Sequence, residues 1–419
     1  RLIYYMEELI QKGKLAKEAS YGLAKLSSDA KNNALTNIAD ALVSQSDYIL
    51  KENAKDVTAA KANNMRSGLV DRLLLTEERI SSMAEGLKQI AALPDPIGEM
   101  ISQTKRPNGL KIGKVRVPIG VIGIIYEARP NVTADAAGLC IKAGNAVILR
   151  GGKEAFASNR AICTVMQNAG YAAGLPVGSI NLVEDTSRES STALMRLNEY
   201  LDVIIPRGGA GLIRAVVENA TVPAIETGTG NCHVYVEKSA DLEMAKNIVI
   251  NAKTQRPSVC NAEEKLLIDK EIAYDFLNII VPALTSRGVS IVGDETVCKA
   301  FDIASPASED DWYTEYLDLK IGIKIVSGID EAIQHINKYN SGHSEAIITN
   351  SYAASQKFLD EIDAAAVYVN ASTRFTDGFE FGFGAEIGIS TQKLHARGPM
   401  GLKSLTSEKY IVYGNGQIR

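Results

Sequence analysis

Short apolar runs alternate with helical stretches over most of this chain, from about residue 117 onward. The run "VPIGVIGIIYE" (117–127) has the length of a buried strand, and "TADAAGLCIKAG" (133–144) after it has the spacing of a helix. Strands joined through helices of this length pair in parallel, because the helical crossover returns the chain to the end of the sheet at which the previous strand began. The pattern therefore predicts an α/β fold whose parallel strands are buried on both faces.

The alternation comes in two series. Strand-like runs of the first series are "VPIGVIGIIYE", "NAVILRGG" (145–152), "SINLVED" (179–185) and "DVIIPRGG" (202–209). The second series begins near "GNCHVYVEK" (230–238), and the two together predict two α/β domains with an active site in the cleft between them. Ligands of such sheets bind at the carboxyl ends of the strands, so the glycine-rich exits "RGGK" (150–153) and "RGGAG" (207–211) are candidate binding turns.

Two parts of the chain lie outside this alternation. Residues 1 to about 100 are polar and helical; Thr76 can cap one helix, which Pro94 and Pro96 end. The segments "LKIGKVRVP" (110–118) and "EKYIVYG" (408–414) alternate like extended strands. Such strands need an edge to pair with, and a partner subunit could supply one.

Composition limits the classes of function. The net charge of −5 and the pI of about 5.6 argue against nucleic-acid binding, which depends on a basic surface. No run approaches the roughly 18 apolar residues that cross a bilayer, and the N-terminal stretch, with Glu7 and Glu8, does not read as a signal peptide. The five scattered cysteines and four histidines lack disulfide or metal-ligand spacing, so no metal is predicted and the chain is assigned to the reducing cytoplasm.

One cysteine differs from the others. Cys260, in "NAKTQRPSVCNAEEKLLI" (251–268), stands in a turn between a helix-like and a strand-like run, shortly after Pro257. A turn can present a thiol to a cleft, near backbone N–H groups that favour the thiolate. Core packing explains the remaining four, which lie in helix or strand patterns: Cys140, Cys163, Cys232 and Cys298.

A series of motifs gives Cys260 its context. In chain order they are "YEARPN" (126–131), "KAGNAVILRGGKEA" (142–155), "IPRGGAGL" (205–212), "IETGTGNCHVYVEKSADLE" (225–243) and "QRPSVCNAEE" (255–264). This series resembles the aldehyde dehydrogenase superfamily. "EAIQHINKYNSGHSEAIIT" (331–349) and "EIGISTQKLHARGPMGL" (386–402) resemble the branch that reduces an acyl phosphate, and the resemblance covers essentially the whole chain.

The resemblance implies an aldehyde dehydrogenase-like α/β fold, with two parallel-sheet domains and a small β extension for oligomerisation. The divisions that it implies are an NADP-binding domain (1–109 and 119–228), a catalytic domain with Cys260 (229–385), and oligomerisation strands with a C-terminal segment (110–118 and 386–419). A homo-oligomer, a dimer or larger, is therefore expected.

The implied activity is the NADPH-dependent reduction of L-glutamyl 5-phosphate to L-glutamate 5-semialdehyde, with release of phosphate, in proline biosynthesis. A thiolate attacks an activated acyl phosphate readily, and the resulting thioester accepts hydride better than a carboxylate does. Functional coupling to glutamate 5-kinase is a further expectation. Two alternatives stay open: a hydrolytic NAD(P)-dependent aldehyde dehydrogenase acting on another aldehyde, and a catalytically silent homologue kept for assembly or scaffolding.

The superfamily's catalytic residues fall on three positions. Its nucleophile falls on Cys260, and its oxyanion-stabilising asparagine falls on Asn131, which could equally cap a helix after Pro130. The glutamate of its "ELGG" motif falls on Glu226, where this chain reads "ETGTG". That residue helps water hydrolyse the thioester in other members, so here it could tune the thiol, contact the nicotinamide side or have no role.

The resemblance also implies cofactor contacts. Residues Arg150, Gly151, Gly152 and Lys153 match the position that binds the adenosine ribose, and two cations there suit a 2′-phosphate unless they are solvated surface charges. Arg207, Gly208 and Gly209 match the loop that faces the nicotinamide half, although a turn without function is an alternative. Glu315, in the loosely matching "EYLDL" (315–319), falls on the glutamate that binds the nicotinamide ribose.

A substrate with carboxylate and phosphate groups calls for cations around the thiol. The candidates beside the matched motifs are Arg129, Lys253, Arg256, Arg374 and Arg397, each of which could instead be a surface charge. His343 and His395 also lie in matched segments and could be structural histidines.

Overall fold

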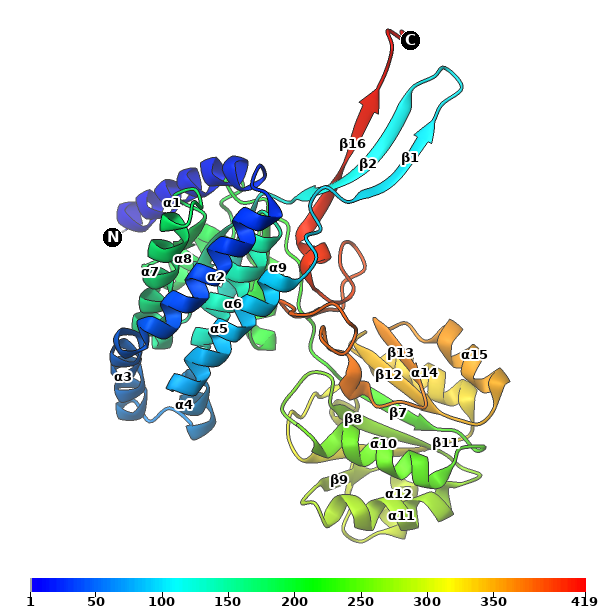
Figure 1. Cartoon of the computed structure of the whole chain (residues 1–419). Coiled ribbons are helices and arrows are strands. Elements are labelled where there is room, and N and C mark those ends of the chain that lie inside the picture. The colour runs from blue at the N-terminus through cyan, green and yellow to red at the C-terminus, as the bar shows by residue number, and fades with distance from the viewer. Residues whose placement is uncertain (1) are drawn as a thin grey trace. The chain divides into compact units, whose positions relative to one another are not determined.

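The chain forms two compact units (Figure 1). The computed structural model describes residues 2–419, and the side chains of residues 6–419, so the first residue of the predicted NADP-binding domain lies outside the described residues. Unit 1 runs to Glu226 and takes in residues 382–388 and 400–419, whereas unit 2 comprises residues 227–381 and 389–399. The division after Glu226 lies close to the predicted boundary at 228, but the C-terminal segment is shared between the units.

Unit 1 contains a four-stranded parallel sheet with the strand order β5-β4-β3-β6. Its strands are β3 (Val121–Tyr126), β4 (Ala146–Arg150), β5 (Ile180–Leu182) and β6 (Val203–Arg207), each inside a run that the sequence predicted as a strand. All six residues of β3 are buried, as expected for a central parallel strand covered on both faces.

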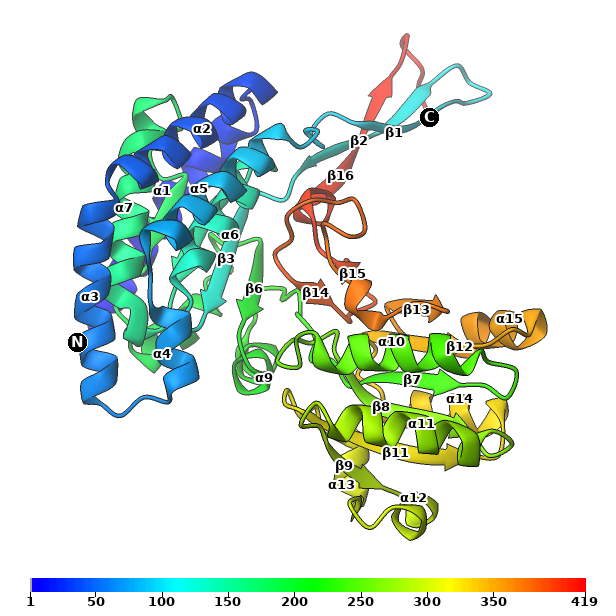
Figure 2. The same cartoon turned by 60° about the horizontal axis from the view of Figure 1, so that its bottom comes forward.

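Helices connect and cover these strands. The crossover helices are α6 (Pro130–Lys142), α7 (Phe156–Ala172), α8 (Arg188–Leu194) and α9 (Ala210–Asn219), with a short 3-10 turn η1 (Lys153–Ala155) before α7. Five N-terminal helices precede the sheet: α1 (Leu2–Leu23), α2 (Ser28–Ser44), α3 (Ser46–Ala62), α4 (Ser67–Leu73) and α5 (Glu77–Ala92). Helix α2 packs on α5, α6 and α7, which gives unit 1 a thick helical layer (Figure 2). Thr76 caps α5 as predicted, by accepting a hydrogen bond from the Arg79 N–H.

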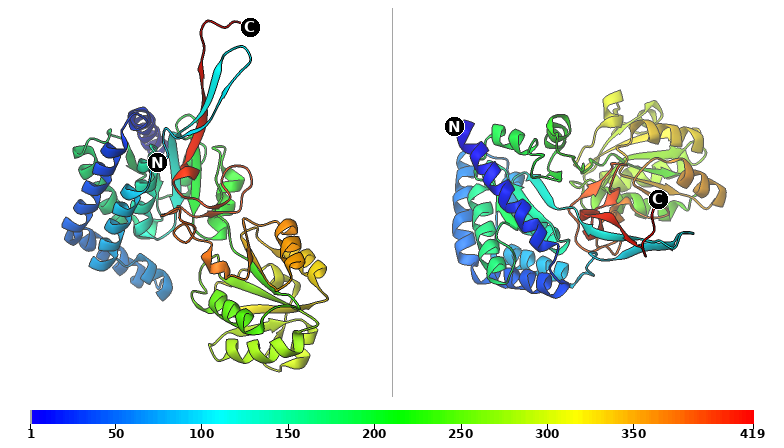
Figure 3. Two further views of the ribbon diagram at one scale, coloured as in Figure 1. Left: turned by 45° about the vertical axis from the view of Figure 1, so that its right-hand side comes forward. Right: turned by 90° about the horizontal axis from the view of Figure 1, so that it is seen from above.

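A three-stranded antiparallel sheet completes unit 1 (Figure 3). It consists of β1 (Met100–Lys105), β2 (Lys111–Pro118) and β16 (Thr406–Tyr413), in the order β1-β2-β16. A short 3-10 turn, η3 (Leu402–Leu405), directly precedes β16. The two extended segments read from the sequence thus pair with each other, in register from Thr406–Pro118 to Tyr413–Lys111. The sequence did not predict β1, which pairs with the other side of β2. Within residues 2–419, the outer edges of β1 and β16 have no neighbouring strand.

Unit 2 is built on a seven-stranded parallel sheet with the order β10-β9-β11-β8-β7-β12-β13. Its strands are β7 (Cys232–Val236), β8 (Glu263–Asp269), β9 (Ser290–Gly293), β10 (Ser305–Pro306), β11 (Lys320–Val326), β12 (Ser344–Ile348) and β13 (Ala366–Val369). Its helices are α10 (Leu242–Thr254), α11 (Ala273–Thr285), α12 (Glu295–Ala300), α13 (Glu309–Tyr313), α14 (Ile329–Tyr339), α15 (Tyr352–Glu361) and η2 (Thr373–Phe375). A small ladder joins β14 (Ile389–Ser390) and β15 (Gly398–Pro399).

Alternate residues of the central strands enter two separate cores. Val234 and Val236 of β7 pack with residues of α10 and α11, whereas Tyr235 between them packs with residues of α14 and α15 on the other face. This period of two is what a parallel strand buried on both faces requires. The rigid sheet that results fixes the loops at both ends of its strands.

Candidate active site

A cavity of about 1090 Å³ lies at the carboxyl ends of the strands of unit 1. The ends of β3 and β4, the loop after β5 and the first halves of α8 and α9 form its walls. This is the edge at which parallel α/β sheets bind their ligands, as the sequence predicted for the glycine-rich turns. The lining residues include Arg150, Gly152 and Lys153 of the predicted cofactor site.

The Arg150 side chain is hydrogen-bonded to backbone carbonyl groups of the protein. Its guanidinium donates hydrogen bonds to the carbonyl oxygens of Thr186 (2.7 Å), Ser187 (2.8 Å) and Gly151 (3.3 Å). These bonds hold the loop before α8 against the end of β4, so Arg150 shapes the wall of the cavity.

Lys153 and Arg188 are exposed and line the same cavity. Neither forms an ion pair within the described part of the chain, which leaves both cations able to meet an anionic ligand. Arg188 was not singled out from the sequence, because the loop "EDTSRES" (184–190) contains no pattern that marks it.

Internal packing already requires several of the glycines. A Cβ at Gly151 would lie 2.1 Å from Nδ2 of Asn159, and one at Gly208 would lie 2.7 Å from Cδ of Glu127. The Glu127 carboxylate also accepts a hydrogen bond from the Gly209 N–H at 3.0 Å, which holds the "PRGG" loop against the end of β3. These turns are therefore fixed before any ligand binds.

Asn131 is the second residue of α6 and is exposed. Its Nδ2 donates a hydrogen bond to Oδ2 of Asp135, one turn further along the helix, at 3.1 Å. The N-cap position belongs to Arg129, whose side chain makes no capping hydrogen bond. Asn131 is therefore not a cap, and its amide is held at the carboxyl end of β3, where α6 begins.

Cys260 lies in unit 2, in the loop between α10 and β8, and is half-buried. Four loops meet at the amino ends of the strands in the sheet of unit 2, because each loop leads into one of four neighbouring parallel strands. They are the segments that precede β7, β8, β11 and β12. The sequence placed Cys260 in a turn correctly, and the strand order explains which other segments accompany it.

The backbone of Cys260 is tightly enclosed. The Cys232 thiol donates a hydrogen bond to the Cys260 carbonyl oxygen at 3.2 Å. A Cβ at Gly230 would lie 1.4 Å from the same oxygen, so only glycine fits there. The Gly230 N–H in turn donates to Oε1 of Glu315 at 2.7 Å. Burial raises the pKa of the Glu315 carboxyl, although the bond from Gly230 opposes this shift.

Arg374 of unit 2 is held against the loop that contains Cys260 by two hydrogen bonds. Its Nε donates to Oε1 of Gln255 at 2.9 Å, and its Nη1 donates to Oδ1 of Asn261. Burial lowers the pKa of the Arg374 guanidinium; the nearby charge of Arg256 acts in the same direction and the Cys260 thiol in the opposite one. Arg374 thus lies within electrostatic reach of both residues.

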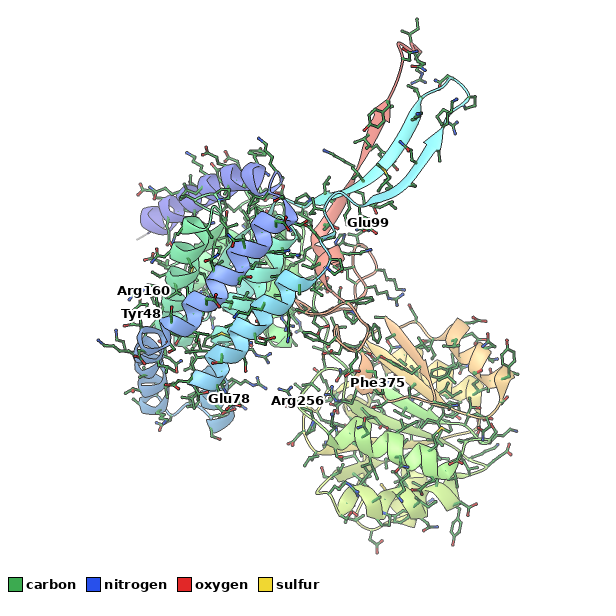
Figure 4. All side chains as sticks on the ribbon, in the orientation of Figure 1. Tyr48, Glu78, Glu99, Arg160, Arg256 and Phe375 are labelled. Atoms are coloured by element: carbon green, nitrogen blue, oxygen red, sulfur yellow. The ribbon has the colours of Figure 1, made fainter. Side chains whose placement is uncertain are left out.

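The Asn261 side chain ties η2 to the Cys260 loop. Its Nδ2 donates to the carbonyl oxygens of Thr376 (3.0 Å) and Arg374 (3.2 Å), and Thr373 Oγ1 donates to the Asn261 carbonyl oxygen at 2.7 Å. Figure 4 labels Arg256 after α10 and Phe375 in η2, the two segments that these bonds join. Sequence reasoning missed Asn261 and Gln255, although both flank the matched cysteine.

The remaining predicted cations are placed elsewhere. Lys253 is fully buried and its Nζ donates to the Glu263 carbonyl oxygen (3.0 Å) and to Oε2 of Glu264 (3.2 Å), so it is not exposed to a ligand. Arg397 is exposed and pairs with Asp363 at 2.7 Å. Arg129 is exposed at the start of α6 in unit 1. Glu226, half-buried, ends the main segment of unit 1.

The two signature histidines differ in burial. His343 is fully buried, its Nδ1 lies 2.8 Å from Oγ of Ser344, and burial lowers its pKa to about 4, so the ring is neutral near pH 7. His395 is exposed. His343 therefore behaves as a structural histidine.

Comparison with known proteins identifies the family. A model described as the aldehyde dehydrogenase family matches residues 6–302 and 321–409. The chain belongs to the aldehyde dehydrogenase family. The predicted aldehyde dehydrogenase fold, with two parallel sheets and a small antiparallel sheet, is thereby confirmed.

Individual proteins are similar to this chain over nearly its whole length. The gamma-glutamyl phosphate reductase of Clostridium botulinum (strain Eklund 17B / Type B) is 63% identical over 414 residues, which cover 99% of this chain and 100% of that protein. The gamma-glutamyl phosphate reductase of Clostridium beijerinckii is 64% identical with the same coverage. The crystal structure of the Thermotoga maritima gamma-glutamyl phosphate reductase has a TM-score of 0.97 and 50% identity, and covers 98% of this chain and 100% of that one.

Two further observations concern the described residues 2–419. Among residues 2–419, none of the helices combines the length and apolar character that a bilayer crossing requires. The same residues contain no group of three or more His, Cys, Asp or Glu side chains placed to hold a metal ion.

Proposed function

We propose that this chain catalyses the NADPH-dependent reduction of L-glutamyl 5-phosphate to L-glutamate 5-semialdehyde, with release of phosphate, as a step of proline biosynthesis. The observation that carries the proposal is the Arg374 guanidinium, which Gln255 and Asn261 hold against the loop that contains the Cys260 thiol. Relatives called gamma-glutamyl phosphate reductase, about 63% identical over nearly the whole chain, support the same activity.

The chemistry at Cys260 has two parts. The thiolate sulfur attacks the acyl carbon and forms a C–S bond; the C–O bond to phosphate then breaks and leaves a thioester on Cys260. Hydride transfer to the thioester carbon, followed by cleavage of the C–S bond, releases the aldehyde and restores the thiolate. NADPH, when bound, supplies that hydride.

Arg374 and Arg256 suit the first part of this chemistry. A guanidinium presents several N–H donors in one plane, which match the oxygens of a phosphate. Gln255 and Asn261 fix the guanidinium of Arg374 through Nε and Nη1, so its position does not depend on the ligand. Negative charge on the departing phosphate is stabilised there.

The oxyanion that forms at the acyl carbon needs hydrogen-bond donors, and the proposal assigns this role to the Asn131 amide with the Cys260 backbone N–H. A donor aimed at a developing oxyanion contributes on the order of 3 kcal/mol. No water takes part in the reductive reaction, so the proposal gives Glu226 no hydrolytic role and retains it as a candidate that tunes the thiol.

The residues around the cavity of unit 1 fit NADPH. The volume of about 1090 Å³ at the carboxyl ends of parallel strands suits a dinucleotide, and Lys153 and Arg188 offer cations to its 2′-phosphate. Acidic residues such as Glu154 and Asp185 also line the cavity and can accept hydrogen bonds from ribose hydroxyls. Arg150 would hold the cavity wall, whereas Arg207, Gly208 and Gly209 would present a rigid loop.

The proposal extends to partners. The acyl phosphate has to come from a kinase that phosphorylates the 5-carboxylate, so we couple this chain functionally to glutamate 5-kinase in the cytoplasm. We also propose a homo-oligomer, because β1 is exposed along its whole length and both outer edges of the β1-β2-β16 sheet lack a neighbouring strand within residues 2–419. Light scattering on a size-exclusion column tests the oligomer.

The reverse reaction tests the function. With glutamate 5-semialdehyde and NADP, we expect NADP reduction that depends on inorganic phosphate and is lost in Cys260→Ala, which still binds NADPH. A hydrolytic aldehyde dehydrogenase would reduce NADP equally well without phosphate, and that result would overturn the proposal. A silent homologue would show no activity in either buffer.

A further inference from the structure

Helix α6 places an acid directly against the amide of Asn131. Asn131 and Asp135 are four residues apart, so they share one face of the helix. The Asn131 Nδ2 donates to Asp135 Oδ2 at 3.1 Å, and this is the one hydrogen bond of the amide that the structure records within the described residues.

The direction of this hydrogen bond has a consequence for the amide. An ionised carboxylate only accepts hydrogen bonds, so it selects the orientation in which Nδ2, and not Oδ1, faces Asp135. One amide hydrogen is then engaged, and the other is directed away from the helix face because the two N–H bonds lie about 120° apart in one plane. In the opposite orientation the amide would present an acceptor, Oδ1, where an oxyanion needs a donor.

We propose that Asp135 is a positioning residue that holds the Asn131 amide with an N–H available to the oxyanion of the reaction. The inference rests on the proposed function, because it presupposes the oxyanion role of Asn131. Asp135 acts through Asn131 and does not itself contact the reacting atoms.

The surroundings of Asp135 fit this role. It is half-buried; from β6 the charge of Arg207 acts on it, and from α5 a Cβ at Gly86 would lie 3.8 Å from its Oδ1. Burial raises the pKa of Asp135 to about 6, whereas the bond from Asn131 and the charge of Arg207 oppose the shift. The carboxyl is therefore ionised at pH 7.5 and becomes protonated below about pH 6, when it can donate to Oδ1 and release the amide from its orientation.

Asp135→Leu and Asp135→Asn test the inference beside Asn131→Ala. We expect Asp135→Leu to lower kcat at pH 7.5 by at least tenfold, with an unchanged Kd for NADPH and an unchanged KM for the semialdehyde. Asp135→Asn keeps the shape and one acceptor but can also donate, so its kcat should be about threefold lower. It should also lack the fall in kcat near pH 6 that we expect of the parent. An unchanged fall in kcat near pH 6 in Asp135→Asn would contradict the assignment of that fall to Asp135.

The double variant Asn131→Ala/Asp135→Leu decides between positioning and a separate role. Positioning predicts that it is no slower than Asn131→Ala alone, because Asp135 then has no amide to orient. Additive losses would overturn the inference, as would a parental kcat in Asp135→Leu when Asn131→Ala is slow. If Asn131→Ala itself keeps the parental kcat, the oxyanion assignment fails and the inference fails with it, whereas phosphate-dependent turnover still tests the proposed function separately.

A matched control comes from helix α5. Gln89 Nε2 donates to Glu85 Oε1 at 3.4 Å, which is likewise an amide–carboxylate pair four residues apart, but exposed. Glu85→Leu should leave kcat and its pH profile unchanged. Thermal melting of all variants separates a loss of folding from a loss of turnover.

Discussion

The thiol of Cys232 donates a hydrogen bond to the backbone carbonyl oxygen of Cys260, with 3.2 Å between sulfur and oxygen. Burial raises the pKa of the Cys232 thiol well above its ordinary value, and the neighbouring acids raise it further, so this sulfur stays protonated and remains a donor. The two cysteines at this edge of the sheet therefore have different tasks: Cys260 reacts in the proposed mechanism, and Cys232 fixes the backbone that carries it.

Replacing Cys232 tests this division. Cys232→Ser keeps a donor of similar size and should retain kcat within about threefold. Cys232→Val removes the donor; we expect a loss of at least tenfold in kcat and of about 1 kcal/mol in the free energy of unfolding. Steady-state kinetics and urea unfolding measure the two effects, with Cys298→Ser as a control, and a parental kcat in Cys232→Val would contradict the assigned task.

Arg374 should act on the phosphate. Arg374→Lys keeps the charge but loses the planar fork that Gln255 and Asn261 hold, so kcat/KM for the acyl phosphate should fall ten- to a hundredfold. In the reverse reaction the KM for inorganic phosphate should rise by a similar factor. The control is Arg287→Lys, because Arg287 is an exposed residue just after α11 that donates to the Ala283 carbonyl oxygen. An unchanged KM for phosphate in Arg374→Lys would remove this residue from the phosphate site.

Lys153 and Arg150 should affect cofactor binding in different ways. Lys153 is exposed in the cavity, so Lys153→Met should raise the Kd for NADPH about tenfold and leave the Kd for NADH unchanged. Arg150 holds the carbonyl oxygens of Thr186 and Ser187, so Arg150→Met should weaken both cofactors by the same factor. Fluorescence titration of the two cofactors measures this. A selective loss of NADPH binding in Arg150→Met would instead assign the 2′-phosphate contact to Arg150.

Buried His343 makes unit 2 sensitive to acid. Its pKa is lowered to about 4 in the folded chain, against about 6.5 in an unfolded one. Between these values the unfolded state binds more protons, so stability is complete above about pH 6.5 and falls as the pH drops toward 4, by about 3 kcal/mol for this group. Urea unfolding at several pH values should show a smaller pH dependence in His343→Gln than in the parent, whereas exposed His395→Gln should keep the parental slope. Equal slopes in all three proteins would contradict this account.

The fold was largely predictable from hydrophobic patterns. The strands that end at Tyr126, Arg150 and Arg207 each lie inside an apolar run of strand length that predicted a strand of the parallel sheet. Strand β1, "MISQTK" (100–105), was missed because all six of its residues are exposed, so burial leaves no alternation to read. The pairing of β2 with β16 joins segments about 290 residues apart, and local sequence contains no information on it.

The site was predictable only in part. Motif resemblance marked Cys260 and Asn131, but the contacts of Cys260 come from strand order, which brings Gly230 and Glu315 to the same edge. Asp135 could have been found, because its spacing of four from Asn131 places both on one helix face. The burial of Lys253 was hidden, because its acidic partner Glu264 follows eleven residues later, in a strand whose seven residues are all buried.

Trapping the acyl-enzyme tests the central claim most directly. In the reverse direction, glutamate semialdehyde and NADP without phosphate should carry the enzyme to the thioester and stop there, because the group that would release it is absent. Mass spectrometry of the acid-quenched, digested protein should then find one glutamyl group on the peptide that contains Cys260, and adding phosphate before the quench should remove it. A glutamyl group on another cysteine, or turnover in phosphate with no group on Cys260 when phosphate is withheld, would contradict the account.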